Sequence, residues 1–436
     1  MALYGDWTVQ LHRWLDFWTA WHIGLMAQFL IAAMGMYVLL RSRRIVPLVS
    51  LTAAVAYAAS TPLVYTLYHR WQLAAFAWIP WLAWATLTAT GGNRRAWSLV
   101  PAFLALALLG SSLQTAFFVL LVWVALWAGA LMSEGVPGRR ARLTAEYAIW
   151  GVLGAGLAAF ALIPALLMYM DGFGLHAARS APGYPHGWDQ PLRSLLLIPL
   201  QVMPTLLGSA RSLDLTKLLA ADLSHVAFLG FIPTVVAMRA AFWDRTPPAV
   251  RILILAGLLL PLSPLVGMLY HRVQVVFVFA GAWAFAWYWQ HADMAEERWW
   301  RPATRAAGVL GVLWLVASVV LWAGEARVAQ ALDVRMAGRL AAGEGGQLAG
   351  FADWMRARAG VLVHELRIWH PAQVVAVAGV ALGLTAVHLR RWRGTGIATG
   401  VLLAATILQL GGLAVGWHRA VDPVRYPPYP ESVDIR

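Results

Sequence analysis

Charged residues are scarce in this sequence, and cysteine is absent. Only 12% of the 436 residues are Asp, Glu, Lys or Arg, whereas soluble domains carry about 25%. So little charge leaves too little polar surface to keep a chain of this size folded in water. The absence of cysteine excludes disulfide bonds that would hold external loops together.

The motifs of several enzyme and transporter classes are missing as well. The sequence has no GxxxxGKS/T loop for nucleotide phosphates, no HExxH, no Cys/His cluster for zinc, and no GxGxxG that follows a strand. Ionisable residues are also nearly absent from the long apolar stretches. This scarcity argues against a proton- or ion-coupled transporter, which normally keeps such groups near the middle of the membrane.

Long apolar stretches dominate the sequence instead. Hydrophobic residues make up 61% of the chain, and the stretches between charged clusters run to about 20 residues, enough to cross a hydrocarbon core about 30 Å thick. We therefore expect an all-α, polytopic integral membrane protein with about 12 transmembrane helices. The predicted spans are 21–40, 46–63, 73–90, 97–111, 114–132, 148–169, 224–242, 251–268, 273–290, 306–323, 371–389 and 396–416.

The arginines predict how these spans are oriented. Lys217 is the only lysine, and the arginines cluster in every second connection between spans. Because positive charge marks the cytoplasmic side, we expect both termini and the loops 64–72, 170–223 and 324–370 to be external. Topology also explains the net charge of +13 better than a nucleic-acid partner would. The clusters are Arg41, Arg43 and Arg44; Arg94 and Arg95; Arg139, Arg140 and Arg142; Arg239 and Arg245; Arg298, Arg301 and Arg305; and Arg390, Arg391 and Arg393.

The chain is expected to alternate between membrane-embedded and external parts. Residues 1–20 form an interfacial segment, in which 11–21 would be an amphipathic helix lying in the membrane surface. The external loop 170–223 includes an apolar, proline-broken stretch at 195–208 that fits a re-entrant or interfacial segment. The remaining parts are a helical bundle at 21–169, a second bundle at 224–323, an external helical loop at 324–370, a last helical pair at 371–416 and an external tail at 417–436.

Polar side chains gather at the predicted external ends of the spans. Arginine forks match phosphate oxygens, so a cleft between these loops would bind a lipid phosphate. Each residue type has an ordinary alternative: an arginine reaches the lipid headgroups, a loop histidine is solvated, and a glutamine hydrogen-bonds a neighbouring helix. The candidate binding residues are His69, Arg70, Gln114, Arg179, His271 and Arg272.

Several apolar segments occur in an order shared with a known family. They are GMYVLLRSRR (35–44), LTAAVAYAAS (51–60), HRWQLAAFAWIPW (69–81), LGSSLQTAFF (109–118), LIPALLMYMDGFGLHAARS (162–180), HVAFLGFIPTVV (225–236), LSPLVGMLYHRVQVVFVF (262–279) and DPVRYPPYP (422–430). In this order the chain resembles bacterial YfhO-type membrane proteins, which belong to the GT-C glycosyltransferase superfamily. The resemblance runs from the first predicted span to the end.

This resemblance implies an enzyme of the bacterial cytoplasmic (inner) membrane that moves a sugar from a polyprenyl-phosphate donor to an extracytoplasmic cell-envelope acceptor. The reaction needs a carboxylate to accept the acceptor's hydroxyl proton. It also needs positive charge, from arginine or a divalent cation, beside the departing lipid phosphate. The candidate carboxylates are Asp16, Asp171 and Asp6. Asp16 is favoured, because partial burial in an interfacial helix would raise its pKa and make it a better base.

The chain also departs from the family pattern. We expect it to lack the first helix with most of the first external loop, and the external C-terminal domain. A partner chain would then supply the first helix. The family's histidine before the glutamine is missing as well, since residues 110–114 read GSSLQ. The core of an inactive or split enzyme therefore stays open, as do a lipid or polysaccharide transporter or scramblase and a non-catalytic membrane assembly subunit.

The orientation gives a direct prediction. Reporter fusions at residues 42, 93 and 392 should behave as cytoplasmic, because these positions lie in arginine-rich connections. Fusions at residues 185 and 345 should behave as external. A cytoplasmic signal from residue 185 would contradict the orientation and would move every candidate site residue to the wrong side.

Overall fold

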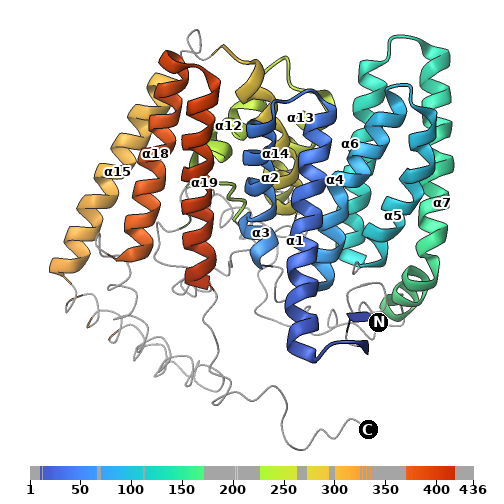
Figure 1. The fold of residues 1–436 in the computed structure, drawn as a ribbon, viewed down its shortest axis with the longest axis horizontal. Helices are drawn as coiled ribbons and strands as arrows, with labels where there is room; N and C mark the ends of the chain where they lie inside the picture. The colour runs from blue at the N-terminus through green and yellow to red at the C-terminus, as the bar shows by residue number, and fades with distance from the viewer. Residues whose placement is uncertain are drawn as a thin grey trace, which may run out of the picture.

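The described part of the chain is all-helical. The structure is a computed structural model, shown in Figure 1. Six of its described helices are long and apolar enough to cross a membrane, so the chain is a multi-pass membrane protein by its helix composition. The structure describes residues 10–11, 13–65, 70–110, 113–170, 202, 204, 226–262, 273–293, 300–324, 327, 330, 334 and 370–417.

The helices differ widely in length. Proline stands at the first helical position of several of them, where its missing N–H group costs nothing. The six that meet the membrane criterion are α1 (Phe17–Ser42), α4 (Arg70–Thr90), α6 (Leu113–Ser133), α7 (Pro137–Met170), α18 (Pro371–Arg393) and α19 (Thr395–Trp417). The others are α2 (Pro47–Ala58), α3 (Thr61–Tyr65), η4 (Arg94–Ser98), α5 (Leu99–Leu109), α12 (Phe231–Ala240), α13 (Pro248–Leu259), η7 (Leu260–Leu262), α14 (Gln274–His291) and α15 (Trp300–Ala323).

Each predicted span contains a helix, but two of the spans are not continuous. The predicted span 46–63 is interrupted at Ala59 and Ser60, between α2 and α3. In the predicted span 224–242, residues 226–230 are not helical, and α12 is only 10 residues long. The expectation of full-length helices was therefore wrong at these two places.

The predicted interfacial helix at 11–21 is also interrupted. The backbone amides of Trp14 and Leu15 both donate to the Leu11 carbonyl, each at 3.0 Å, and form a short turn. The long helix α1 begins only at Phe17, with Asp16 as its N-cap. A capping carboxylate satisfies a free amide of the first helical turn, and this local interaction prevails over the amphipathic pattern.

The arginine-rich connections share one end of the molecule, which we call the arginine-rich end. The connections α1–α2, α4–α5, α6–α7 and α18–α19 all lie there, at the top of Figure 1. Arginines at this end donate to backbone carbonyls of the connections between helices: Arg251 Nη2 reaches Trp243 O at 2.8 Å and Arg140 Nε reaches Glu134 O at 2.7 Å. These arginines therefore stabilise the connections of this end.

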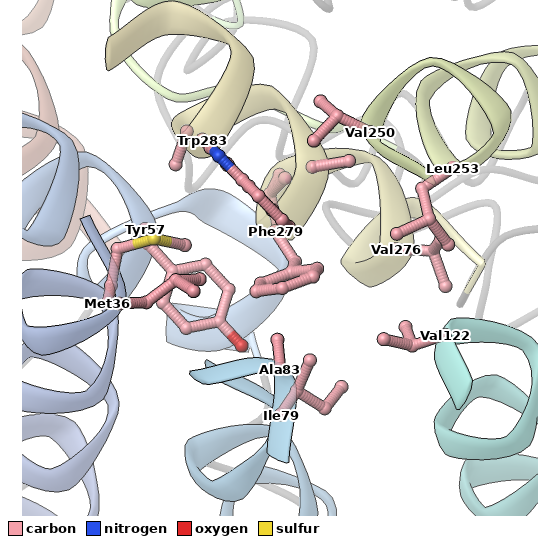
Figure 2. Packing of buried hydrophobic residues seen from close by; sticks show 14 of the residues in the cluster. Met36, Tyr57, Ile79, Ala83, Val122, Val250, Leu253, Val276, Phe279 and Trp283 are labelled. Carbon is pink, nitrogen blue, oxygen red and sulfur yellow. The ribbon is translucent and has the colours of Figure 1, made fainter. Parts of the chain in front are cut away.

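Helix α14 lies at the centre of the core. It packs against α2, α12 and α13, and nearly every residue from Gln274 to Trp289 is buried. The rings of Tyr57 and Phe279 face each other edge-on, with centroids 6.0 Å apart, between side chains of α1 and α4 (Figure 2). A helix that is apolar on all sides is suited to burial among other helices, and α14 occupies such a position.

Glycines allow the closest helix contacts. A Cβ atom on Gly257 of α13 would lie 2.9 Å from the Phe277 backbone nitrogen of α14, and one on Gly129 of α6 would lie 2.6 Å from the Ala249 nitrogen. Small residues let helix backbones approach closely in membranes, where packing rather than water drives association. The α13–α14 and α6–α13 crossings therefore depend on glycine.

This packing predicts opposite effects for two glycine substitutions. Gly257→Ala should lower the free energy of unfolding by about 1–3 kcal/mol, because the added methyl group meets rigid backbone. Gly156→Ala on the exposed face of α7, where an added Cβ meets nothing within 4 Å, should leave stability unchanged or raise it. Thermal unfolding of both purified variants checks this, and equal melting temperatures would contradict the close α13–α14 packing.

Candidate functional site

Three of the predicted site residues fall within the described part of the chain. Asp16 caps α1, Arg70 is the first residue of α4, and Gln114 lies in the first turn of α6, where its side chain is half-buried. All three lie at the end opposite the arginine-rich end. Helices α1, α4 and α6 each begin there and run toward the arginine-rich end. Asp6, His69, Asp171, Arg179, His271 and Arg272 lie outside the described residues.

Three helices in mutual contact begin at this opposite end. Helices α4, α6 and α14 contact one another, and all three begin there. Each N-terminus carries partial positive charge from its free amide groups. The sequence positions that border them include Arg70, Gln114 and the segment just before Gln274, and α7 ends here at Met170. Free amide groups at helix N-termini favour an anionic group.

The expectation of a raised pKa for Asp16 was wrong. The Asp16 side chain is exposed and not partly buried. Hydrogen bonds from the Thr19 side chain and the Thr19 backbone amide, the latter at 3.0 Å, hold the pKa of Asp16 below its ordinary value of 3.8. The ionised carboxylate therefore stabilises the start of α1 above that pH, and this contribution disappears as the pH falls through the lowered pKa. Asp16 is a helix cap and a weak base.

A buried break in the helices leaves backbone groups of the core without helical hydrogen bonds. Residues 226–230 are buried yet not helical, and they lie beside the α2–α3 interruption. Thr61 pairs with this segment: its backbone amide donates to Phe228 O at 3.2 Å, and its hydroxyl accepts from Phe228 N at 3.0 Å. The same hydroxyl donates to Val226 O. One threonine thus replaces several missing helical hydrogen bonds.

Two other side chains accept hydrogen bonds from the backbone amides at the start of α12. Leu229 N donates to the Thr234 hydroxyl at 3.0 Å, and Phe231 N donates to Gln409 Oε1 of α19 at 2.9 Å. Gly230 between them has φ +98°, a conformation that favours glycine over residues with a Cβ. An added Cβ on Gly379 would collide with the Gln409 side chain, so glycine at that position keeps room for the amide.

Two polar atoms near the break have no hydrogen-bond partner among the residues that the structure describes. They are Ser60 Oγ and Gln274 Oε1, both buried. Ser60 lies in the interruption between α2 and α3, and Gln274 is the first residue of α14. Within the described ranges, no group of three or more His, Cys, Asp or Glu side chains is placed to hold a metal ion.

The sequence-based reasoning missed the residues of this break. Ser60, Thr61, Thr234 and Gln409 were treated as ordinary members of apolar spans. A signal was present in the residues next to them: Thr61 precedes Pro62, and Gly230 stands three residues before Pro233. Proline and glycine so close together inside a span indicate an interrupted helix.

The chain was also compared with known proteins. Neither a family model, nor a curated protein, nor a solved structure matches it. The resemblance to YfhO-type proteins therefore rests on the sequence segments alone.

The break predicts a specific sensitivity at Gln409. Gln409→Leu should destabilise the protein by about 1–3 kcal/mol, because Phe231 N would lose its acceptor inside the membrane. The matched control is Thr385→Val in α18, whose hydroxyl donates to Ala381 O on an exposed face and should matter little. Thermal unfolding in nanodiscs measures both variants. A Gln409→Leu protein as stable as the control would show that the amide does not hold the break.

Proposed function

We propose that this chain is the membrane core of a GT-C-like glycosyltransferase. In this proposal all twelve predicted spans belong to the membrane-embedded bundle in the bacterial cytoplasmic membrane, and the end opposite the arginine-rich end faces outside. There the enzyme moves a sugar from a polyprenyl-phosphate donor to a cell-envelope acceptor. The family resemblance implies the chemistry, and the helices that begin at one end of the molecule support the choice of that end as its location.

The common starting end of α4, α6 and α14 carries the proposal. These helices contact one another and begin at the same end, and the free amides of helix N-termini favour a lipid phosphate at the membrane surface there. In this account Arg70, together with Arg179 and Arg272, binds the phosphate and stabilises it as it departs. A divalent cation would do the same work if the enzyme uses one.

The catalytic base in this proposal is Asp171 or Asp6. Asp16 is the weaker candidate because it already caps α1 with a lowered pKa. Asp171 directly follows the last residue of α7, at the end where α4, α6 and α14 begin. A carboxylate there would accept the proton of the acceptor hydroxyl as the sugar is transferred.

The distribution of acidic residues argues against ion-coupled transport. Ion-coupled transporters keep carboxylates near mid-membrane. In the described ranges, acidic residues lie at helix ends or in connections, except Glu146, which sits early in α7 and pairs with Arg142 at 3.0 Å. The acidic residues are Asp16, Glu134, Glu146, Asp244 and Asp293.

A lipid transporter or scramblase is the second candidate function. The interruption between α2 and α3 and the buried start of α12 favour it, because broken helices often border substrate paths in transporters. This alternative predicts movement of lipid between the two leaflets without any sugar transfer.

Donor binding tests the site. With the full chain in nanodiscs, Arg70→Ala, Arg179→Ala and Arg272→Ala should each weaken polyprenyl-phosphate binding by about 10- to 100-fold, the loss expected for a charge-assisted hydrogen bond. Arg95→Ala removes an exposed arginine at the arginine-rich end and should leave binding unchanged. Equal affinities in all four variants would show that Arg70, Arg179 and Arg272 only contact lipid headgroups and do not bind the donor.

Sugar transfer tests the reaction with the same preparations. Asp171→Asn or Asp6→Asn should abolish transfer, whereas Asp16→Asn should keep it, because asparagine caps a helix as well as aspartate does. Transfer that starts only after a one-span partner chain is added would identify a split enzyme. Lipid scrambling in proteoliposomes without any transfer would favour the second candidate function.

A further inference from the structure

Three segments meet at a corner of the arginine-rich end. Gln290, near the end of α14, joins α14 to the α1–α2 connection. Its Oε1 accepts from Val46 N at 2.7 Å, and its Nε2 donates to Arg44 O at 3.0 Å. Two residues further along, Ala292 O accepts from Arg390 Nη2 of α18 at 2.9 Å. The α1–α2 connection and the ends of α14 and α18 are thereby fixed around one point.

The Arg390 guanidinium is held in a defined orientation. It stacks over the Trp289 ring, with its Cζ 4.6 Å from the ring centroid. Trp289 is itself buried and donates through Nε1 to the Thr399 hydroxyl of α19 at 3.0 Å. With one face on the indole and one N–H on a carbonyl, the Arg390 side chain is held in place, and it is half-buried.

Two guanidinium donors here have no acceptor among the residues that the structure describes. They are Arg390 Nη1 and Arg43 Nε, both buried within half-buried side chains. The exposed arginines Arg41, Arg44 and Arg391 add positive charge at the same end. The carboxylate of Asp293 lies close enough to interact electrostatically with Arg390. Among the described residues of this corner, the arginines outnumber this carboxylate.

We propose that this corner binds the phosphodiester headgroup of an anionic phospholipid in the leaflet at the arginine-rich end. A guanidinium fork matches phosphate oxygens in shape and charge, and basic pockets between membrane helices bind such headgroups. Exposed apolar side chains at this end, Val46 at 42% and Trp392 at 74% exposure, provide surface for the lipid's glycerol and acyl groups. A free phosphate ion would gain nothing from that apolar surface.

The test is a lipid titration of the full detergent-solubilised chain, followed by native mass spectrometry. Phosphatidylglycerol should bind at least about tenfold more tightly than phosphatidylcholine of the same chain length. Arg390→Gln and Arg43→Gln should each remove most of this preference. Arg390→Lys keeps the positive charge but loses the guanidinium fork, so it serves as a control in case the neutral variant misfolds. It should also bind phosphatidylglycerol more weakly than wild type.

The control and the competing ligand decide the outcome. Arg95→Gln removes the same charge from an exposed position at the same end and should keep the full preference for phosphatidylglycerol. An equal loss in Arg95→Gln would show a general effect of surface charge and overturn the site. Unchanged binding in both Arg390→Gln and Arg43→Gln would overturn it too. If inorganic phosphate displaces the lipid at equal concentration, the corner is an ion site, and the lipid assignment is wrong.

Discussion

The structure depends on one constraint: a backbone amide or carbonyl inside the membrane must find its hydrogen-bond partner within the protein. A continuous helix meets this requirement by itself. The break at residues 226–230 does not, and there the partners are side chains that come from distant parts of the sequence. Thr61 lies 165 residues from Val226, and Gln409 lies 178 residues from Phe231. These two side chains allow a polar, irregular segment to exist in an otherwise apolar core.

The same two contacts tie the outer helices to the centre. Through Gln409, α19 is fixed to the start of α12, and through Thr61 the α2–α3 pair is fixed to the segment before it. Helix α14 fills the space between α2, α12 and α13, and glycines such as Gly257 bring the backbones close together. The two ends then differ in character. One end combines arginines and capping contacts, and the opposite end gathers the N-termini of α4, α6 and α14.

Much of the helical pattern could be predicted from the sequence, because apolar stretches and arginine clusters are local signals. The breaks at 59–60 and 226–230 could not be predicted, because hydropathy does not show which distant side chain will accept a hydrogen bond from a free backbone amide. Asp16 shows the opposite limit. The amphipathic spacing around it predicted a continuous helix with a partly buried base, but Asp16 is exposed, and hydrogen bonds from the Thr19 side chain and backbone amide lower its pKa. Of the predicted binding residues, only Arg70 and Gln114 lie in the described part of the chain.

Hydrogen–deuterium exchange of the full chain in nanodiscs tests the central claim most directly. If side chains satisfy the break, the amides of Phe228, Leu229 and Phe231 should exchange as slowly as those in the middle of α14, although residues 228 and 229 are not helical. The exposed Gly135, in the connection between α6 and α7, provides a fast reference within the same molecule. Exchange at residues 228, 229 and 231 as fast as at Gly135 would show that the break is open to water, and would contradict the account.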